Sequence, residues 1–165
     1  MTDMTKRSTA TPTRVVFVEP TPTLNDLSGV LCATTLLAEG ASFMSAGDQR
    51  NEAIRIFFSP KPKPLSKIAL TAGAISRAKD IASNVAKIGY TRQAQGIDFY
   101  PTLGDITELI ERASAVVNAV LSTPGCSYAK SIDMGVATTL LRQATTTAEN
   151  LADAVKNNAN PFPRY

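Results

Sequence analysis

The sequence predicts an all-α fold: an antiparallel helical bundle of about four long helices with extended N- and C-terminal arms. Apolar residues recur at steps of three and four along four long stretches, which is the spacing of one helix face. Short links separate these stretches, as in antiparallel bundles. Proline is concentrated near both ends of the chain, together with threonine at the N-terminal end, and proline excludes regular helix. We therefore divide the chain into an N-terminal arm (1–22), a helical bundle domain (23–157) and an extended C-terminal tail (158–165).

The N-terminal arm contains a short β-prone run, Arg14-Val15-Val16-Phe17-Val18. One strand alone is not stable, so this run is expected to pair with another subunit or to pack on helices. The C-terminal tail, "NNANPFPRY", is also proline-rich and offers two aromatic anchors. The residues expected to contact other subunits are Val15, Val16, Phe17, Val18, Phe162 and Tyr165.

Two similar stretches, Pro22–Asp26 ("PTLND") and Pro101–Asp105 ("PTLGD"), begin two of the predicted helices. In each, threonine is a favourable N-cap, and the aspartate three residues later can complete a capping box. Because the residues that follow do not match, we interpret the likeness as one local solution used twice rather than as a repeat. The first of these helices is expected from Thr23 to Gly47. Its apolar face is Leu24, Leu27, Val30, Leu31, Thr34, Leu37, Ala41 and Met44.

The next segment, residues 48–58, favours a short helix capped by Asp48, with a strand through Ile54–Phe58 as the alternative. Pro60–Pro64 ("PKPKP") is expected to be a stiff extended connector. A long helix is then predicted from Leu65 to Ile88, ended by a glycine. Its apolar face is Leu65, Ile68, Ala72, Ile75, Ala78, Ile81, Ala82, Val85 and Ile88.

Two more helices complete the predicted bundle. One is capped by Thr102 and ends before Pro124-Gly125, and its apolar face is Ile106, Leu109, Ile110, Ala113, Val116, Val117 and Val120. The last is expected over about Ser131–Asn157, with an apolar face of Ile132, Val136, Leu140, Ala144, Thr147, Leu151 and Val155. Four glycines lie inside predicted helices, where each costs about 1 kcal/mol relative to alanine. They indicate either close helix packing or a kink, and they are Gly29, Gly40, Gly73 and Gly135.

The composition excludes several classes of enzyme. The chain has 165 residues, a net charge of +3 and no histidine. Without histidine, neither Ser-His-Asp nor Cys-His catalysis can be built within the chain, and two cysteines are too few for a structural zinc site. The common glycine-rich phosphate-binding patterns are also missing. We therefore expect no enzymatic activity, no cofactor and no bound metal.

The cysteines and the clustered carboxylates have ordinary structural explanations. Cys32 lies in an apolar helical run, which predicts a buried free thiol. Cys126 follows a turn, a position compatible with an exposed thiol. Asp105, Glu108 and Glu111 lie near the start of one predicted helix, where acids are favourable in their own right. A solvated helix face is the expectation for these three residues.

Charge is segregated along the middle of the chain. Between Lys61 and Arg92, seven basic residues accompany a single acid, Asp80, whereas the following segment Asp98–Glu111 has four acids and no base. The basic residues are candidates for contact with nucleic acid or another anionic partner, or with the acidic segment of a neighbouring subunit. They are Lys61, Lys63, Lys67, Arg77, Lys79, Lys87 and Arg92.

Together these features favour a non-catalytic structural subunit that assembles with copies of itself, through its terminal arms, into a large ordered assembly such as a virus coat or shell. Nucleic acid and other structural proteins are further candidate partners. The alternatives are an accessory or linker subunit of a hetero-oligomeric complex and a small nucleic-acid-binding module. We find no apolar run of membrane-spanning or signal-peptide length, and we expect the protein in a virion if it is viral and in the cytoplasm otherwise.

Overall fold

The computed structural model describes residues 22–89 and 102–159, and every described element is helical. The elements are α2 (Leu24–Ser42), α3 (Ala46–Phe57), α4 (Lys67–Asn84), the π-helix η1 (Val85–Gly89), α6 (Leu103–Ser122) and α7 (Tyr128–Ala159). The prediction of an all-α fold is confirmed for this part of the chain. The arm through position 21 and the six C-terminal residues lie outside the described residues, so the contacts expected of Val15, Val16, Phe17, Val18, Phe162 and Tyr165 do too.

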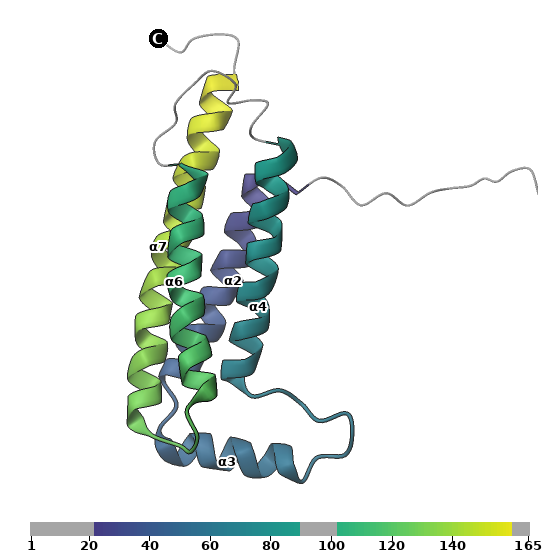
Figure 1. Ribbon diagram of the computed structural model, residues 1–165, viewed down its shortest axis with the longest axis vertical. Helices are drawn as coiled ribbons and strands as arrows, with labels where there is room; N and C mark the ends of the chain where they lie inside the picture. Colours follow the sequence, from purple (N-terminus) through teal and green to yellow (C-terminus); the bar gives the residue numbers. More distant parts are fainter. Residues whose placement is uncertain (1–21, 90–101, 160–165) are drawn as a thin grey trace, which may run out of the picture.

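Four long helices lie side by side and the short helix α3 lies across one end of them (Figure 1). Around the core, α2 packs against α7 and α4, and α6 packs against the same two helices. The chain turns by 107° between α2 and α3. We call the end formed by α3, its connector to α4 and the turn between α6 and α7 the α3 end. The opposite end, formed by the start of α2, η1, the start of α6 and the end of α7, is the far end (Figure 1).

One hydrophobic core runs between the four long helices. Its largest fully buried apolar side chains are Leu27, Leu31, Ile75, Val85, Ile106, Ile110, Val117, Met134, Leu141 and Leu151. Threonines are buried among them, and their hydroxyl groups remain hydrogen-bonded because each donates to the backbone carbonyl one turn earlier. Thr34 donates to Val30, and Thr71 donates to Lys67.

Most of the helix starts follow from capping chemistry. The capping boxes predicted at Thr23 and Thr102 are both present, with Asp26 and Asp105 completing them. Residues 46–57 are a helix, which confirms the favoured alternative, but Asp48 is not its cap. Ser45 is the N-cap, and the Asp48 side chain accepts a hydrogen bond from the Ser45 backbone N–H. The helix predicted to run to Gly47 ends at Ser42 instead, because Ser45 already caps the next helix, α3.

Two predicted helix faces differ from the structure. Ser66 caps α4, so Leu65 lies before the helix and is exposed. In the first half of α7, Ile132 and Val136 are 53% and 47% exposed, whereas Leu140 of the predicted face is buried. The other buried residues there are Ser131, Met134, Ala137, Thr138 and Leu141. The reason is that α7 packs between α2 and α6, so its buried face must point between those helices. The Ser131 hydroxyl also donates to the Met44 carbonyl, which holds that rotation.

The four helix glycines are not sites of close packing within the described structure. A Cβ atom built on Gly29, Gly40, Gly73 or Gly135 would meet no atom within 4 Å outside its own helical backbone. Each glycine lies within one unbroken helix. The close-packing explanation is therefore wrong for contacts among the described residues. Each of these glycines has open space where a side chain would lie.

Candidate interaction surfaces

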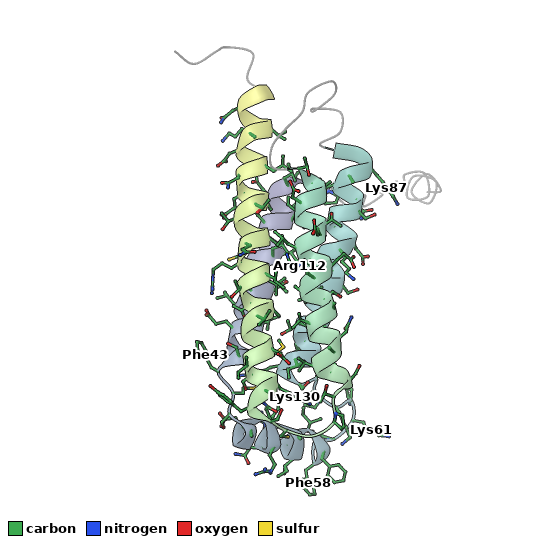
Figure 2. The ribbon with its side chains drawn as sticks, turned by 60° about the vertical axis from the view of Figure 1, so that its left-hand side comes forward. Phe43, Phe58, Lys61, Lys87, Arg112 and Lys130 are labelled. Atoms are coloured by element: carbon green, nitrogen blue, oxygen red, sulfur yellow. The ribbon has the colours of Figure 1, made fainter. Side chains whose placement is uncertain are left out.

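The basic residues predicted as an anionic contact are spread along the molecule. Lys61 and Lys63 lie on the connector, Lys67 begins α4, Arg77 and Lys79 lie within it, and Lys87 lies in η1 at the far end (Figure 2). Arg92 lies outside the described residues. The structure therefore brings together only the first three of these residues, at the α3 end.

Two of these lysines have partners within the chain. Lys79 Nζ lies 3.4 Å from Glu111 Oε1 on α6. Lys63 Nζ donates to the carbonyl oxygens of Phe57 and Ser59 at 2.7 and 3.1 Å, where the last carbonyls of α3 lack helical partners. It also lies 5.7 Å from the centre of the Phe57 ring. Lys63 therefore caps the end of α3.

The acidic residues of α6 form a solvated face, as predicted. Asp105, Glu108 and Glu111 are all exposed. Among the described residues, no group of three carboxylate or thiol side chains is arranged to hold a metal ion. Because Glu111 pairs with Lys79, the basic and acidic segments meet inside one chain at this point.

Both cysteines are free and exposed, so the buried thiol predicted for Cys32 is wrong. Cys32 lies on the side of α2 that faces away from α4 and α7, opposite the buried residues Leu27 and Leu31. Its apolar sequence neighbourhood did not indicate burial, because the outward side of this helix is apolar as well.

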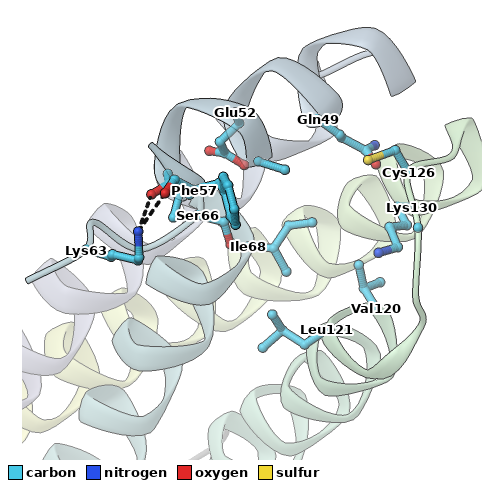
Figure 3. Close-up of a pocket in the computed structure, with 13 residues that line it drawn as sticks. Gln49, Glu52, Phe57, Lys63, Ser66, Ile68, Val120, Leu121, Cys126 and Lys130 are labelled. Carbon is cyan, nitrogen blue, oxygen red and sulfur yellow. Dashed lines mark hydrogen bonds between the residues drawn. The ribbon is translucent and has the colours of Figure 1, made fainter. Parts of the chain in front are cut away.

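A pocket of about 430 Å³ lies between α3, the start of α4 and the turn between α6 and α7 (Figure 3). Its apolar lining comes from Ala53, Ile56, Phe57, Ile68, Val120 and Leu121. Its polar lining comes from Gln49, Glu52, Lys63, Ser66, Cys126 and Lys130. No histidine exists in the chain to act with the Cys126 thiol as a general base.

The polar groups that line this pocket hold α3 in place. The Gln49 amide donates to the Ser127 carbonyl at 2.9 Å, and its oxygen accepts from the Ser127 N–H at 3.0 Å. Glu52 is buried and accepts from the Lys67 N–H at 3.0 Å, at the start of α4. Gln49 and Glu52 therefore join α3 to the long helices at this pocket.

The outward side of α2 is an apolar surface that no described residue covers. We call it the α2 face, and it consists of Gly29, Cys32, Ala33, Leu36, Gly40 and Phe43. Leu36 is 63% exposed and Phe43, the C-cap, is 79% exposed. The only charged residue of α2 beyond its first turn, Glu39, lies at the edge of this face and bonds to Arg142 of α7 at 2.7 Å. A solvent-facing helix surface normally carries charge, so this surface is typical of an interaction site.

The α3 end is a second exposed apolar surface, and it is also basic. The described residues include eleven exposed large hydrophobic side chains, and six of them lie at this end: Ile54, Phe57, Phe58, Leu65, Leu121 and Tyr128. Exposed cations surround them at Arg50, Arg55, Lys61, Lys63 and Lys67. Phe58 and Lys61 both lie at this end of the molecule (Figure 2). We call this set of residues the α3-end surface.

Sequence reasoning missed both surfaces, although each had a signal. The run Leu27–Ala38 contains no charged residue over more than three helical turns. A helix of that composition is apolar on every side and needs cover on every side. For α3, the signal was Phe57-Phe58 two residues after Arg55, at the end of a helix with few apolar residues to bury.

Comparisons of this chain with protein-family models, with curated proteins and with solved structures found no match. Within the described ranges, no single helix is long and apolar enough to cross a membrane. The bent pair formed by α2 and α3 meets that criterion of length and composition when the two helices are taken together.

Proposed function

We propose that this protein is a non-catalytic structural subunit: an antiparallel four-helix bundle with extended arms that associates with copies of itself into a large ordered assembly, of the virus coat or shell type. The observation that carries the proposal is the uncovered α2 face. An apolar surface that the chain itself does not cover is typical of an interaction site, and we assign this one to contact with another protein. The missing histidine, which removes the common nucleophilic mechanisms, agrees with a structural role.

The α2 face is complementary to itself. If two copies pack their α2 helices antiparallel with the Leu36 residues at the centre, Phe43 of each copy lies opposite Gly29 of the other, since both are seven residues from Leu36. The Gly29 position is open, because a Cβ there would meet no atom within 4 Å. The face extends about 21 Å from Gly29 to Phe43 at the usual helical rise. In a two-fold contact residue i meets j while j meets i, and a large side chain opposite an open glycine fits that pairing.

A two-fold contact alone makes a dimer, so a larger assembly needs a second contact. We propose that the N-terminal arm and the C-terminal tail provide it, through Val15–Val18, Phe162 and Tyr165. A proline-rich segment with a few apolar anchors cannot bury enough surface on its own and gains stability by binding another chain. In this arrangement the α2 face builds the dimer and the arms link dimers.

Sedimentation velocity of the full chain tests the proposal. We expect large particles from the natural protein, and much smaller species from Leu36→Glu and Phe43→Glu, because each places a charge in an apolar contact. Ala115→Glu is the matched control, since Ala115 is exposed on α6 and lies outside both surfaces. A natural protein that sediments as a monomer, or variants that assemble like the control, would contradict the proposal.

Cross-linking tests the antiparallel register. In a Cys126→Ser background, Gly40→Cys places a new thiol opposite Cys32 of the other copy, because each lies four residues from Leu36. A short thiol-reactive cross-linker should then produce covalent dimers. Gly135→Cys is the control, since that position is equally open but lies on α7. Equal cross-linking of both variants would argue against the register. Particles that form only after a different protein is added would favour the alternative of an accessory subunit.

A further inference from the structure

We propose that the α3-end surface docks on an anionic lipid membrane, with the bundle standing end-on. This inference goes beyond assembly, which uses the α2 face and the arms. It rests on three properties of the α3 end: where the exposed apolar side chains lie, how α3 is oriented, and the excess of positive charge there.

The exposed apolar side chains are concentrated at one end of the molecule. Phe57 and Phe58 are 70% and 77% exposed and pack edge to face with ring centres 5.1 Å apart. Ile54 and Leu65 are exposed near them, on α3 and on the connector. At the far end, the described residues include no exposed large hydrophobic side chain. The molecule is therefore amphipathic along its long axis.

The orientation of α3 suits a flat apolar boundary. The chain turns by 107° from α2 into α3, so α3 runs across the end of the four long helices (Figure 1). When the long helices stand upright on a surface, α3 lies in the plane of that surface. Its buried residues, Gln49 and Glu52, point toward the bundle, which leaves Ile54 and Phe58 on the outward side. An amphipathic helix in the plane of the head groups binds membranes in this way.

The α3 end carries more positive than negative charge. Residues 43–67 contain two acids, Asp48 and Glu52, against five cations. The cations of the same segment are all exposed: Arg50, Arg55, Lys61, Lys63 and Lys67. Basic residues beside an inserted apolar group attract anionic head groups. Phe57 and the Lys63 ammonium above it combine both features at one position.

The two other kinds of partner fit this surface less well. Single-stranded nucleic acid would use the two phenylalanines for stacking and the cations for phosphates, but it gains nothing from exposed Ile54 and Leu65. The far end of another copy offers acids such as Asp26 and Asp105, but no exposed large hydrophobic group among its described residues. An anionic bilayer offers negative charge and an apolar interior together.

Vesicle flotation with the full chain tests the proposal, using phosphatidylcholine vesicles with and without one quarter phosphatidylglycerol. We expect binding to the anionic vesicles, weakened by salt. The double variant Phe57→Ser/Phe58→Ser and the variant Arg55→Glu should each reduce binding by about tenfold or more. Lys87→Glu, the control at the far end, should bind like the natural protein. All variants change exposed side chains, and circular dichroism verifies that each is folded.

Assembly must be separated from membrane binding, because an assembled particle binds with many copies at once. The phenylalanine variant is therefore also compared with its parent in a Leu36→Glu background, where the α2 contact is absent. This comparison can be interpreted even if the protein does not assemble, because both proteins in it lack the α2 contact. The membrane proposal is overturned if neither vesicle binds, if both vesicles bind equally, or if the phenylalanine variant binds like its parent. It is also overturned if that variant loses binding to a single-stranded oligonucleotide, or loses particle formation, while vesicle binding is unchanged.

Discussion

Single residues decide where the helices begin. At Thr23 and Asp26, the threonine N–H donates to the carboxylate at 2.8 Å and the aspartate N–H donates to the hydroxyl at 3.2 Å. Thr102 and Asp105 make the same two bonds at the same distances. The likeness of "PTLND" and "PTLGD" thus has a local physical cause, since both stretches supply the threonine and aspartate of a capping box.

The third capping box makes stability depend on pH. Hydrogen bonds from the Ser45 backbone and side chain lower the pKa of Asp48. An acid whose pKa is lower in the folded protein stabilises the fold above its unfolded pKa, which is about 3.9 for aspartate. This stabilisation is lost as the pH falls through the lower, folded value. We expect the difference in unfolding free energy between the natural protein and Asp48→Asn to shrink from pH 6 to pH 2, as measured by urea denaturation. Asp133→Asn, which changes an exposed aspartate outside any capping box, should not show the same trend.

Replacement of glycine by alanine should stabilise the protein at a helical position and destabilise it at a position with positive φ. Gly73 lies in a helix with open space around its Cβ position, so Gly73→Ala should raise the free energy of unfolding by up to about 1 kcal/mol. Gly125 has a φ of +85°, which strains residues with a side chain, so Gly125→Ala should lower it by about 1 kcal/mol. Urea denaturation measures both. A stabilised Gly125→Ala variant would contradict the described turn.

At the scale of elements, α3 is held by polar side chains rather than by apolar packing. Its only buried residues are Gln49 and Glu52, and both bond to backbone groups of other segments. Ser131 adds a bond across the same seam, to the Met44 carbonyl. An apolar pocket remains beside these bonds (Figure 3). The position of α3 therefore depends on a few directional contacts, which fix its angle across the long helices while leaving its apolar residues exposed.

Removal of the Gln49 side chain should release α3. Gln49→Ala leaves the Ser127 N–H and carbonyl without their partner, and we expect a loss of about 2 kcal/mol in unfolding free energy. Amide hydrogen exchange should show faster exchange at Ser127. Asn51→Ala, which changes an exposed amide on the same helix, should cost no more than about 0.5 kcal/mol. Equal effects of the two variants would contradict an anchoring role for Gln49.

At the scale of the whole molecule, the two ends have different character. The α3 end presents exposed apolar and basic side chains, and the described far end presents acids such as Asp26, Asp105 and Glu108 with no exposed large hydrophobic group. The α2 face runs along one side between these ends. Each surface therefore has its own proposed partner: a second copy at the α2 face and a membrane at the α3 end.

If the α2 face forms the dimer and the arms link dimers, removal of the N-terminal arm has a specific expected product. Deletion of residues 1–22 should prevent large particles while leaving dimers, because the α2 face is still intact. Far-UV circular dichroism should keep the helical signal, since the core is built from residues beyond the arm. Sedimentation velocity distinguishes dimers from particles. Full-size particles from the truncated chain would refute the proposed role of the arm.

Local rules made much of this fold predictable from the sequence. Helix caps depend on residues within one turn, so the caps at Thr23 and Thr102 could be predicted from the sequence. The same holds for helical spacing, which placed Ile75 and Ile110 on buried faces. The rotation of α7 could not be read in this way. Two apolar stripes compete on that helix, and only its packing between α2 and α6 buries Met134 and exposes Ile132.

The surfaces were decided by tertiary structure for the same reason. By itself, the sequence determined that α2 is apolar over several turns, that Phe57-Phe58 follow a cation, and that histidine chemistry is absent. Which side of α2 is covered depends on the neighbours that the fold supplies, and α4 and α7 cover only the side of Leu27 and Leu31. Likewise, exposure of Phe58 at one end follows from the angle of α3, which long-range bonds from Gln49 and Glu52 set. Local spacing allows several faces of a helix to be buried, and contacts between distant segments decide which of them is.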